Sequence, residues 1–177
     1  MNMPSEISGW FDFDDIYDAA VNRASSGSVF IEIGCFLGRS TAHLAKAIKS
    51  SGKSIDLHVI DSFVGESGED NTGLRERFLS NMAEHGVGNA FRLHHGPSSS
   101  FAHLFADASV DFVFIDGDHS YEGCATDIRL YAPKVKPYGV IAGHDYYDAK
   151  GVRQAVDEAF GSDIKVSRSS WIFEKQV

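Results

Sequence analysis

Short apolar runs of strand length alternate along this chain with longer segments in which apolar residues recur at helical spacing. A parallel sheet with helical crossovers requires this alternation, so the pattern predicts the α/β class. The strand-like runs are residues 28–33, 55–60, 91–94, 110–115, 140–142, 163–167 and 171–174. The helical segments between them are residues 40–49, 74–86, 98–105, 121–135 and 152–159.

Two parts of this pattern define the sheet further. The run 110–115 is apolar on both faces, as an interior parallel strand should be. The last two runs are joined only by residues 168–170, which are too few for a parallel crossover, so they predict an antiparallel hairpin. We therefore expect one domain over residues 1–177, built on a seven-stranded, mostly parallel sheet with an antiparallel C-terminal hairpin.

The charge and hydropathy of the chain exclude several classes of function. It has 25 acidic and 16 basic residues, a net charge of −9, which disfavours binding to nucleic acid or to an anionic membrane surface. The longest unbroken apolar run is 112–115, too short for a membrane span or a secretion signal, so we expect a cytoplasmic protein. Cys35 and Cys124 are too few for a disulfide framework and are expected to be buried thiols.

A glycine-containing turn follows the first strand-like run and leads into a helix. Gly34 and Gly38 allow the backbone to approach a ligand, and the helix beginning near Ser40 offers free N–H groups to a carboxylate or phosphate. Asp61, at the end of the next strand, is placed to bind a ribose hydroxyl. The alternative is that the two glycines only permit tight packing between strand and helix.

Glu32 narrows the choice of cofactor. A carboxylate just before the turn would repel a pyrophosphate, which disfavours a nicotinamide oxidoreductase, but it suits an ammonium group. S-adenosylmethionine, with its amino-acid head and adenosine tail, satisfies Glu32, the helix N-terminus and Asp61 together. The alternative for Glu32 is a surface charge at a strand end.

Polar clusters also follow the fourth and fifth strand-like runs. Because the carboxyl ends of parallel strands share one edge of the sheet, both clusters should border the same crevice. Asp116, His144 and Asp145 supply three ligands for a divalent cation, and Asp118 or His119 could accept a proton. The alternative is that Asp118 caps the helix that begins near Ser120 while Asp116 binds backbone amides.

With these clusters, residues 114–123 and 143–146 resemble the class I S-adenosylmethionine-dependent methyltransferases, with their Rossmann-like fold. Within that family they are similar to the small-molecule O-methyltransferases that include macrocin and other sugar O-methyltransferases and the cephalosporin-hydroxylase-like proteins. The resemblance implies a cofactor site formed by Glu32, Gly34, Gly38, Ser40, Asp61, Phe63, Ser98 and Asp116. Within it, Phe63 and Ser98 would lie near the adenine and Asp116 at the site of methyl transfer. The resemblance also implies a magnesium-like ion held by Asp116, His144 and Asp145, with Asp118 as the base.

The sequence departs from that family in two places. His144 stands where relatives usually carry an acidic residue, which shifts the expectation from magnesium toward manganese, iron or no metal. The segment before the first strand is short, so the acceptor pocket is open, completed by residues 65–73, or completed by a partner subunit. This segment is rich in apolar residues that need cover, from their own sheet or from a second chain, and we favour a homodimer. They are Trp10, Phe11, Phe13, Ile16 and Tyr17.

The function expected from these observations is O-methylation of a small hydroxylated acceptor, a sugar or a phenol, with a possible magnesium or manganese ion to lower the pKa of the hydroxyl. Two alternatives come from other classes: a metal-dependent hydrolase, and a non-catalytic module that binds the cofactor. The hydrolase would leave the glycine turn and Asp61 without a role.

Overall fold

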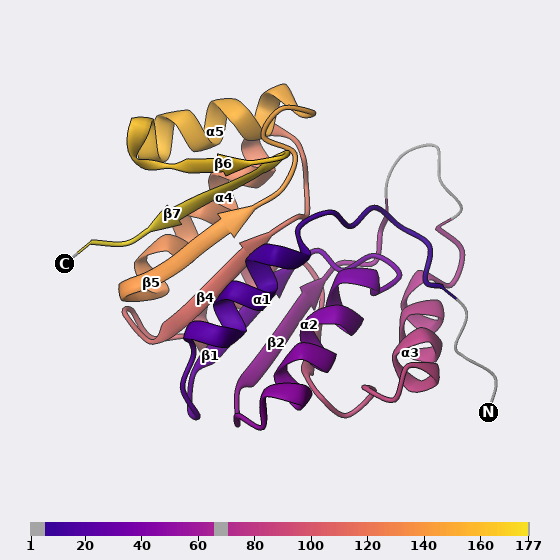
Figure 1. Cartoon of the computed structure of the whole chain (residues 1–177). Helices are drawn as coiled ribbons and strands as arrows, with labels where there is room; N and C mark the ends of the chain where they lie inside the picture. The colour runs from indigo at the N-terminus through magenta and orange to yellow at the C-terminus, as the bar shows by residue number, and fades with distance from the viewer. Residues whose placement is uncertain (1–5, 66–70, 177) are drawn as a thin grey trace.

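The computed structural model describes residues 6–65 and 71–176, which form a seven-stranded sheet in the order β3-β2-β1-β4-β5-β7-β6 (Figure 1). Strands β1 to β5 are parallel, and β7 and β6 continue the sheet as an antiparallel hairpin, as the sequence predicts. The strands are β1 Val29–Ile33, β2 Asp56–Asp61, β3 Arg92–His95, β4 Val110–Ile115, β5 Val135–Gly143, β6 Lys165–Ser167 and β7 Ser170–Glu174. The α-helices are α1 Asp14–Arg23, α2 Arg39–Ser51, α3 Leu74–Glu84, α4 Tyr121–Tyr131 and α5 Lys150–Phe160.

Helices cover both faces of the sheet, and β4 shows how its residues divide between the two cores. Phe112 and Phe114 pack in one core with α1, α2 and α3, whereas Val113 and Ile115 pack in the other with α4 and α5. Successive side chains of a strand point to opposite faces, so a strand covered on both faces must be apolar throughout. In Figure 1, α1 and α2 lie in front of the sheet and α4 behind it.

The prediction was wrong between residues 121 and 139. The helix was expected to continue to Val135 and to end at Pro137, but α4 ends at Tyr131 and a 3-10 turn, Ala132–Lys134, leads into β5 at Val135. Pro133 is the reason, since it lacks the N–H that another α-helical turn would need. The segment 98–105 is likewise two 3-10 turns, Ser98–Ser100 and Ala102–Leu104, rather than one helix.

The N-terminal segment folds against its own sheet. It forms α1, which was not predicted, and Phe13 stacks on Phe114 while Tyr17 contacts the same ring edge-on. The expected homodimer was inferred from apolar residues without cover, and the sheet supplies that cover for Phe13, Ile16 and Tyr17. Trp10 remains 78% exposed.

Other expectations concern single residues or short segments. Cys35 and Cys124 are both buried free thiols, as expected. The loop 65–73 lies partly outside the described residues. Among the described helices, none combines the length and apolar character that a membrane crossing needs.

Candidate active site

A cleft of about 1350 Å³ opens along the carboxyl ends of the parallel strands. The turns after β1, β2, β4 and β5 line it, as does the segment after β3. The N-terminal segment forms a further wall with Ser8, Gly9 and Trp10. The sequence therefore predicted the correct edge of the sheet for the polar clusters but did not indicate this wall.

The two glycines of the first turn have different roles. Gly34 has φ +85°, and a Cβ placed there would lie 1.9 Å from the carbonyl oxygen of Asp116, so only glycine lets the two turns meet at the floor of the cleft. At Gly38 a Cβ would instead meet Met82 at 2.4 Å and the Phe78 ring at 2.8 Å. Gly38 lies outside the cleft lining, and it permits the packing of α2 against α3.

Glu32 is buried beneath this turn, with 1% of its surface exposed, so the surface alternative is wrong. Its carboxylate accepts hydrogen bonds from the hydroxyls of Tyr17 at 2.8 Å, Ser40 at 2.7 Å and Thr41. Burial raises the pKa of Glu32 to about 7, although the three hydroxyl donors oppose the rise. Of Glu32 and its three donors, only Ser40 lines the cleft.

Asp61 holds the turn together from the end of β2. Its Oδ2 accepts from the backbone N–H groups of Cys35 at 2.6 Å and Phe36 at 3.0 Å, and its Oδ1 accepts from that of Phe63 at 2.6 Å. Phe36 and Phe63 both have positive φ, so these bonds stabilise two unfavourable backbone conformations. Asp61 lines the cleft, whereas Phe63 packs on Phe78 outside it.

Ser98 lines the cleft together with a residue that the sequence analysis missed. Asp127, on α4, accepts a short hydrogen bond from the Ser98 hydroxyl, and burial raises its pKa to about 6. The missed signal was helical spacing, because Asp127 shares the buried stripe of α4 with Cys124, Ile128 and Tyr131. Buried positions are usually apolar, so a carboxylate in such a stripe indicates a candidate functional residue.

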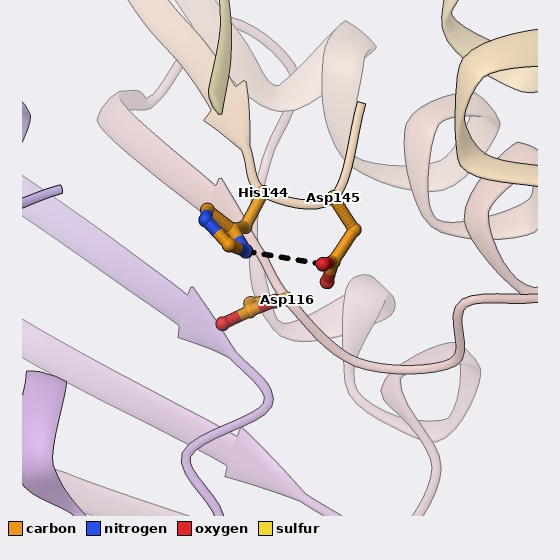
Figure 2. A group of neighbouring side chains, drawn as sticks. All are labelled: Asp116, His144 and Asp145. Carbon is orange, nitrogen blue, oxygen red and sulfur yellow. Dashed lines mark ion pairs between the residues drawn. The ribbon is translucent and has the colours of Figure 1, made fainter. Parts of the chain in front are cut away.

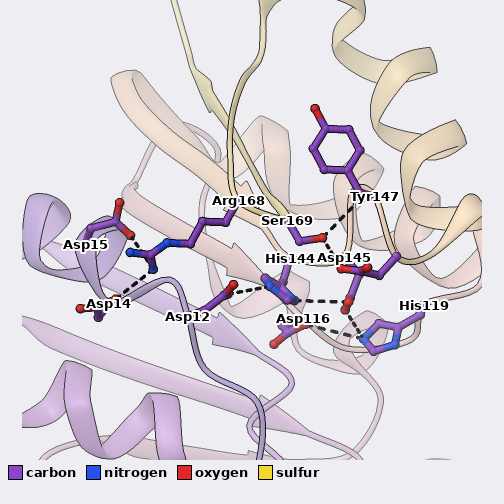
Figure 3. Close-up of polar contacts among 11 residues, drawn as sticks. Asp12, Asp14, Asp15, Asp116, His119, His144, Asp145, Tyr147, Arg168 and Ser169 are labelled. Carbon is purple, nitrogen blue, oxygen red and sulfur yellow. Dashed lines mark hydrogen bonds and ion pairs between the residues drawn. The ribbon is translucent and has the colours of Figure 1, made fainter.

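Asp116, His144 and Asp145 come together as predicted, with one ligand atom of each within 4.8 Å of the others (Figure 2). His144 and Asp145 follow β5, and Asp145 has φ 59°, a conformation that aspartate tolerates better than most residues. The His144 Nδ1 lies 3.3 Å from the Asp145 Oδ1. Its Nε2 lies 3.0 Å from the Oδ1 of Asp12, a partner that no sequence signal indicated (Figure 3).

The electrostatics of this cluster are mutual. Burial and the neighbouring Asp145 raise the pKa of Asp116. Burial alone would raise the pKa of Asp145, but the hydrogen bond with His144 and the nearby His119 lower it. For His144, burial acts to lower the pKa, yet the surrounding carboxylates raise it. The cluster therefore favours cationic charge beside its carboxylates.

The donor set also suits a divalent cation. A metal-bound histidine commonly donates its other ring N–H to a carboxylate, which orients the ring. With Asp12 accepting from Nε2, the Nδ1 of His144 is the nitrogen left to face a cation together with Asp116 and Asp145. Two carboxylates and one imidazole match manganese or iron better than magnesium.

The two candidate bases differ in their surroundings. The Nε2 of His119 lies 3.1 Å from the Asp145 Oδ2 and 3.6 Å from the Asp116 Oδ1, so His119 belongs to the cluster (Figure 3). Asp118 is exposed at the cleft and accepts from the backbone N–H of Ser120 at 2.9 Å. Ser120, not Asp118, is the N-cap of α4, because its hydroxyl accepts from the N–H of Gly123.

The comparison with protein families identifies this architecture. Residues 31–146, which include the first turn and both polar clusters, match the model of the family described as a methyltransferase domain. The chain belongs to this methyltransferase family. The matched region includes the candidate metal ligands as well as the candidate bases, and the match gives no support to the hydrolase alternative.

Solved structures share the methyltransferase fold at low sequence identity. The O-methyltransferase NovP matches with a TM-score of 0.67 and 19% identity over 93% of this chain and 79% of its own. TomG from Streptomyces achromogenes, solved with S-adenosylmethionine, matches with a TM-score of 0.66 and 20% identity over 96% of this chain and 82% of its own. CalS11, a TDP-rhamnose 3'-O-methyltransferase, matches with a TM-score of 0.62 and 14% identity over 91% of this chain and 77% of its own. No curated protein matches the chain in sequence.

Proposed function

We propose that this methyltransferase uses S-adenosylmethionine to methylate a hydroxyl group of a small acceptor, a sugar or a phenol. The observation that carries the proposal is the contact of the Gly34 turn with Asp116, which joins the first turn and the fourth-strand cluster in one cleft. The solved relative TomG, which is described as bound to S-adenosylmethionine, supports the choice of cofactor.

The residues around the first turn suit such a cofactor. Among the described residues no side chain caps α2, so the N–H groups of its first turn are available to a carboxylate beside Ser40. Asp61 accepts three backbone bonds, and a carboxylate has about four acceptor positions, which leaves one for a ribose hydroxyl. Glu32, Gly38 and Phe63 would then support this site from outside the cleft, and Ser98 would lie near the base.

The fourth- and fifth-strand clusters suit the acceptor. When bound, S-adenosylmethionine supplies an electrophilic methyl group on a sulfonium. Asp116, His144 and Asp145 would hold a divalent cation that lowers the pKa of the acceptor hydroxyl. Asp118 or His119 would accept the proton, and positioning of the two reactants supplies much of the acceleration.

The charge of the cleft favours an acceptor without phosphate. Arg39 is the one Lys or Arg of the described residues in the lining, and its guanidinium is bound by Glu6 at 2.6 Å and by the Gly9 carbonyl at 2.9 Å. Among residues 6–65 and 71–176, seven carboxylates line the same cleft: Asp61, Asp116, Asp118, Glu122, Asp127, Asp145 and Asp148. The exposed ring of Trp10 at the wall adds an apolar face suited to a sugar or phenol ring.

Thermal unfolding with S-adenosylhomocysteine tests the proposal without a known acceptor. A ligand at about 100 times its dissociation constant should stabilise the protein by roughly 2.7 kcal/mol, and NAD and ATP at the same concentration should not. No melting shift at millimolar S-adenosylhomocysteine would refute it. Methyl transfer to matched sugars with and without a phosphate group then tests the acceptor class, with the phosphorylated member expected to be inactive.

A further inference from the structure

Asp127 is a carboxylate of the cleft that the proposed function does not use. It lies on α4 with 4% of its surface exposed, yet it belongs to the cleft lining. Its Oδ1 accepts from the hydroxyl of Ser98. Within residues 6–65 and 71–176 no other hydrogen bond or ion pair reaches its carboxylate.

The other two carboxylates near the first turn show how unusual this is. Glu32 has three hydroxyl donors and Asp61 has three backbone N–H donors. A buried carboxylate is costly unless its acceptor positions are filled. Asp127 has one donor, so its Oδ2 is an acceptor position that a ligand in the cleft can fill.

The position of this oxygen points to one part of the cofactor. A Cβ added at Gly117 would lie 3.8 Å from the Asp127 Oδ2, so this oxygen is close to the residue that follows Asp116. On its other side, Asp127 and Tyr131 both hold the segment after β3, since the Tyr131 hydroxyl donates to the Ser98 carbonyl at 2.8 Å. Asp127 therefore lies between the fourth-strand turn and the Ser98 segment, near which the base of the proposed cofactor would lie.

We propose that Asp127 recognises the purine base of the cofactor by accepting a hydrogen bond from its exocyclic amino group. This inference rests on the proposed function. Adenine carries its N–H donors on that amino group, and a carboxylate, which only accepts, is complementary to it. Ser98 fixes the carboxylate in place through Oδ1 and leaves Oδ2 for the base.

The test compares S-adenosylhomocysteine with its 6-deamino analogue, in which hydrogen replaces the amino group. Isothermal titration calorimetry gives both affinities for the whole chain. A hydrogen bond to a charged group predicts that the wild-type protein binds the analogue roughly 10- to 100-fold more weakly. Asp127→Ala should bind the two compounds equally, and Asp127→Asn, which keeps the shape and a weaker acceptor, should show an intermediate preference. Asp163→Asn, which removes a negative charge from an exposed position, is the matched control and should keep the wild-type preference.

The ratio of the two affinities separates recognition from a merely structural role. If Asp127 only holds Ser98, both affinities fall together in the variants and the wild-type ratio remains, which overturns the inference. Equal binding of the two compounds by the wild-type protein also overturns it, even if Asp127→Ala fails to fold. In both cases the proposed function stands, whereas absence of any S-adenosylhomocysteine binding by the wild-type protein refutes the proposed function as well.

Discussion

The two sides of the cleft use carboxylates in different ways. On the β1 and β2 side, Glu32 and Asp61 are each surrounded by donors from hydroxyls or backbone amides. On the β4 and β5 side, Asp116 and Asp145 face each other and the imidazoles of His119 and His144. In the first arrangement donors of the protein fill most of the acceptor positions of each carboxylate, and in the second the carboxylates and imidazoles keep positions open for a ligand. Substitutions on the two sides should therefore affect different measurements.

The largest effect is expected for the proton acceptor on the β4 and β5 side. A positioned base contributes about 10²- to 10⁴-fold to turnover, so loss of the correct one should lower kcat by that factor. Asp118→Asn and His119→Gln are matched variants that remove the basic group and keep a polar side chain. Steady-state rates on an identified acceptor decide between them, and affinity for S-adenosylhomocysteine should stay unchanged in both. Wild-type turnover in both variants would show that neither residue is the base.

On the opposite side, Asp61→Ala should mainly affect stability. The variant leaves the N–H groups of Cys35, Phe36 and Phe63 without their acceptor, two of them at residues with positive φ. The loss of several charge-assisted bonds should lower the free energy of unfolding by about 3 kcal/mol, measured by urea denaturation. Asp61→Asn retains an acceptor and should lose less. An unchanged midpoint in Asp61→Ala would mean that these bonds do not stabilise the turn.

The same side should also show a pH dependence that originates in Glu32. Its pKa is raised from 4.5 to about 7 in the folded protein, so its contribution to stability is complete below pH 4.5 and is lost as the pH rises through 7. The shift corresponds to about 3 kcal/mol of unfolding free energy between pH 4.5 and pH 8. The Glu32→Gln variant cannot ionise at this position. The difference between its unfolding free energy and that of the wild type should therefore rise in favour of the variant by this amount from pH 4.5 to pH 8. Parallel curves for the two proteins would contradict the assignment.

A smaller effect is expected for the cation on the β4 and β5 side. Asp145→Ala should weaken Mn²⁺ binding by roughly 10- to 100-fold, because it removes one ligand and the partner of His144. Electron paramagnetic resonance of free Mn²⁺ measures this without an acceptor. Asp148→Ala, also an acidic residue of the cleft lining, is the control and should bind Mn²⁺ as the wild type does. Equal binding by Asp145→Ala would place the cation elsewhere or remove it from the proposal.

The contacts that could be predicted from the sequence also differ between the two sides of the cleft. The meeting of Asp116, His144 and Asp145 could be predicted, because each follows a parallel strand and such strands end at one edge of a sheet. The environment of Glu32 could not, because Tyr17 comes from a helix that was not predicted. The Asp12 partner of His144 was missed for a similar reason, since it lies 132 residues away and no local pattern connects the two.

By itself, the sequence determined which strand each functional group of the cleft follows. A glycine turn follows the first strand, a carboxylate follows the second, and two polar clusters follow the fourth and fifth. These follow from local periodicity and from the geometry of parallel sheets, which act over a few residues at a time. Only the tertiary structure decided which carboxylates are saturated and which are open. That distinction depends on donors brought from α1, from α2 and from the segment after β3, and hydrogen bonds between distant elements form only when the whole core packs.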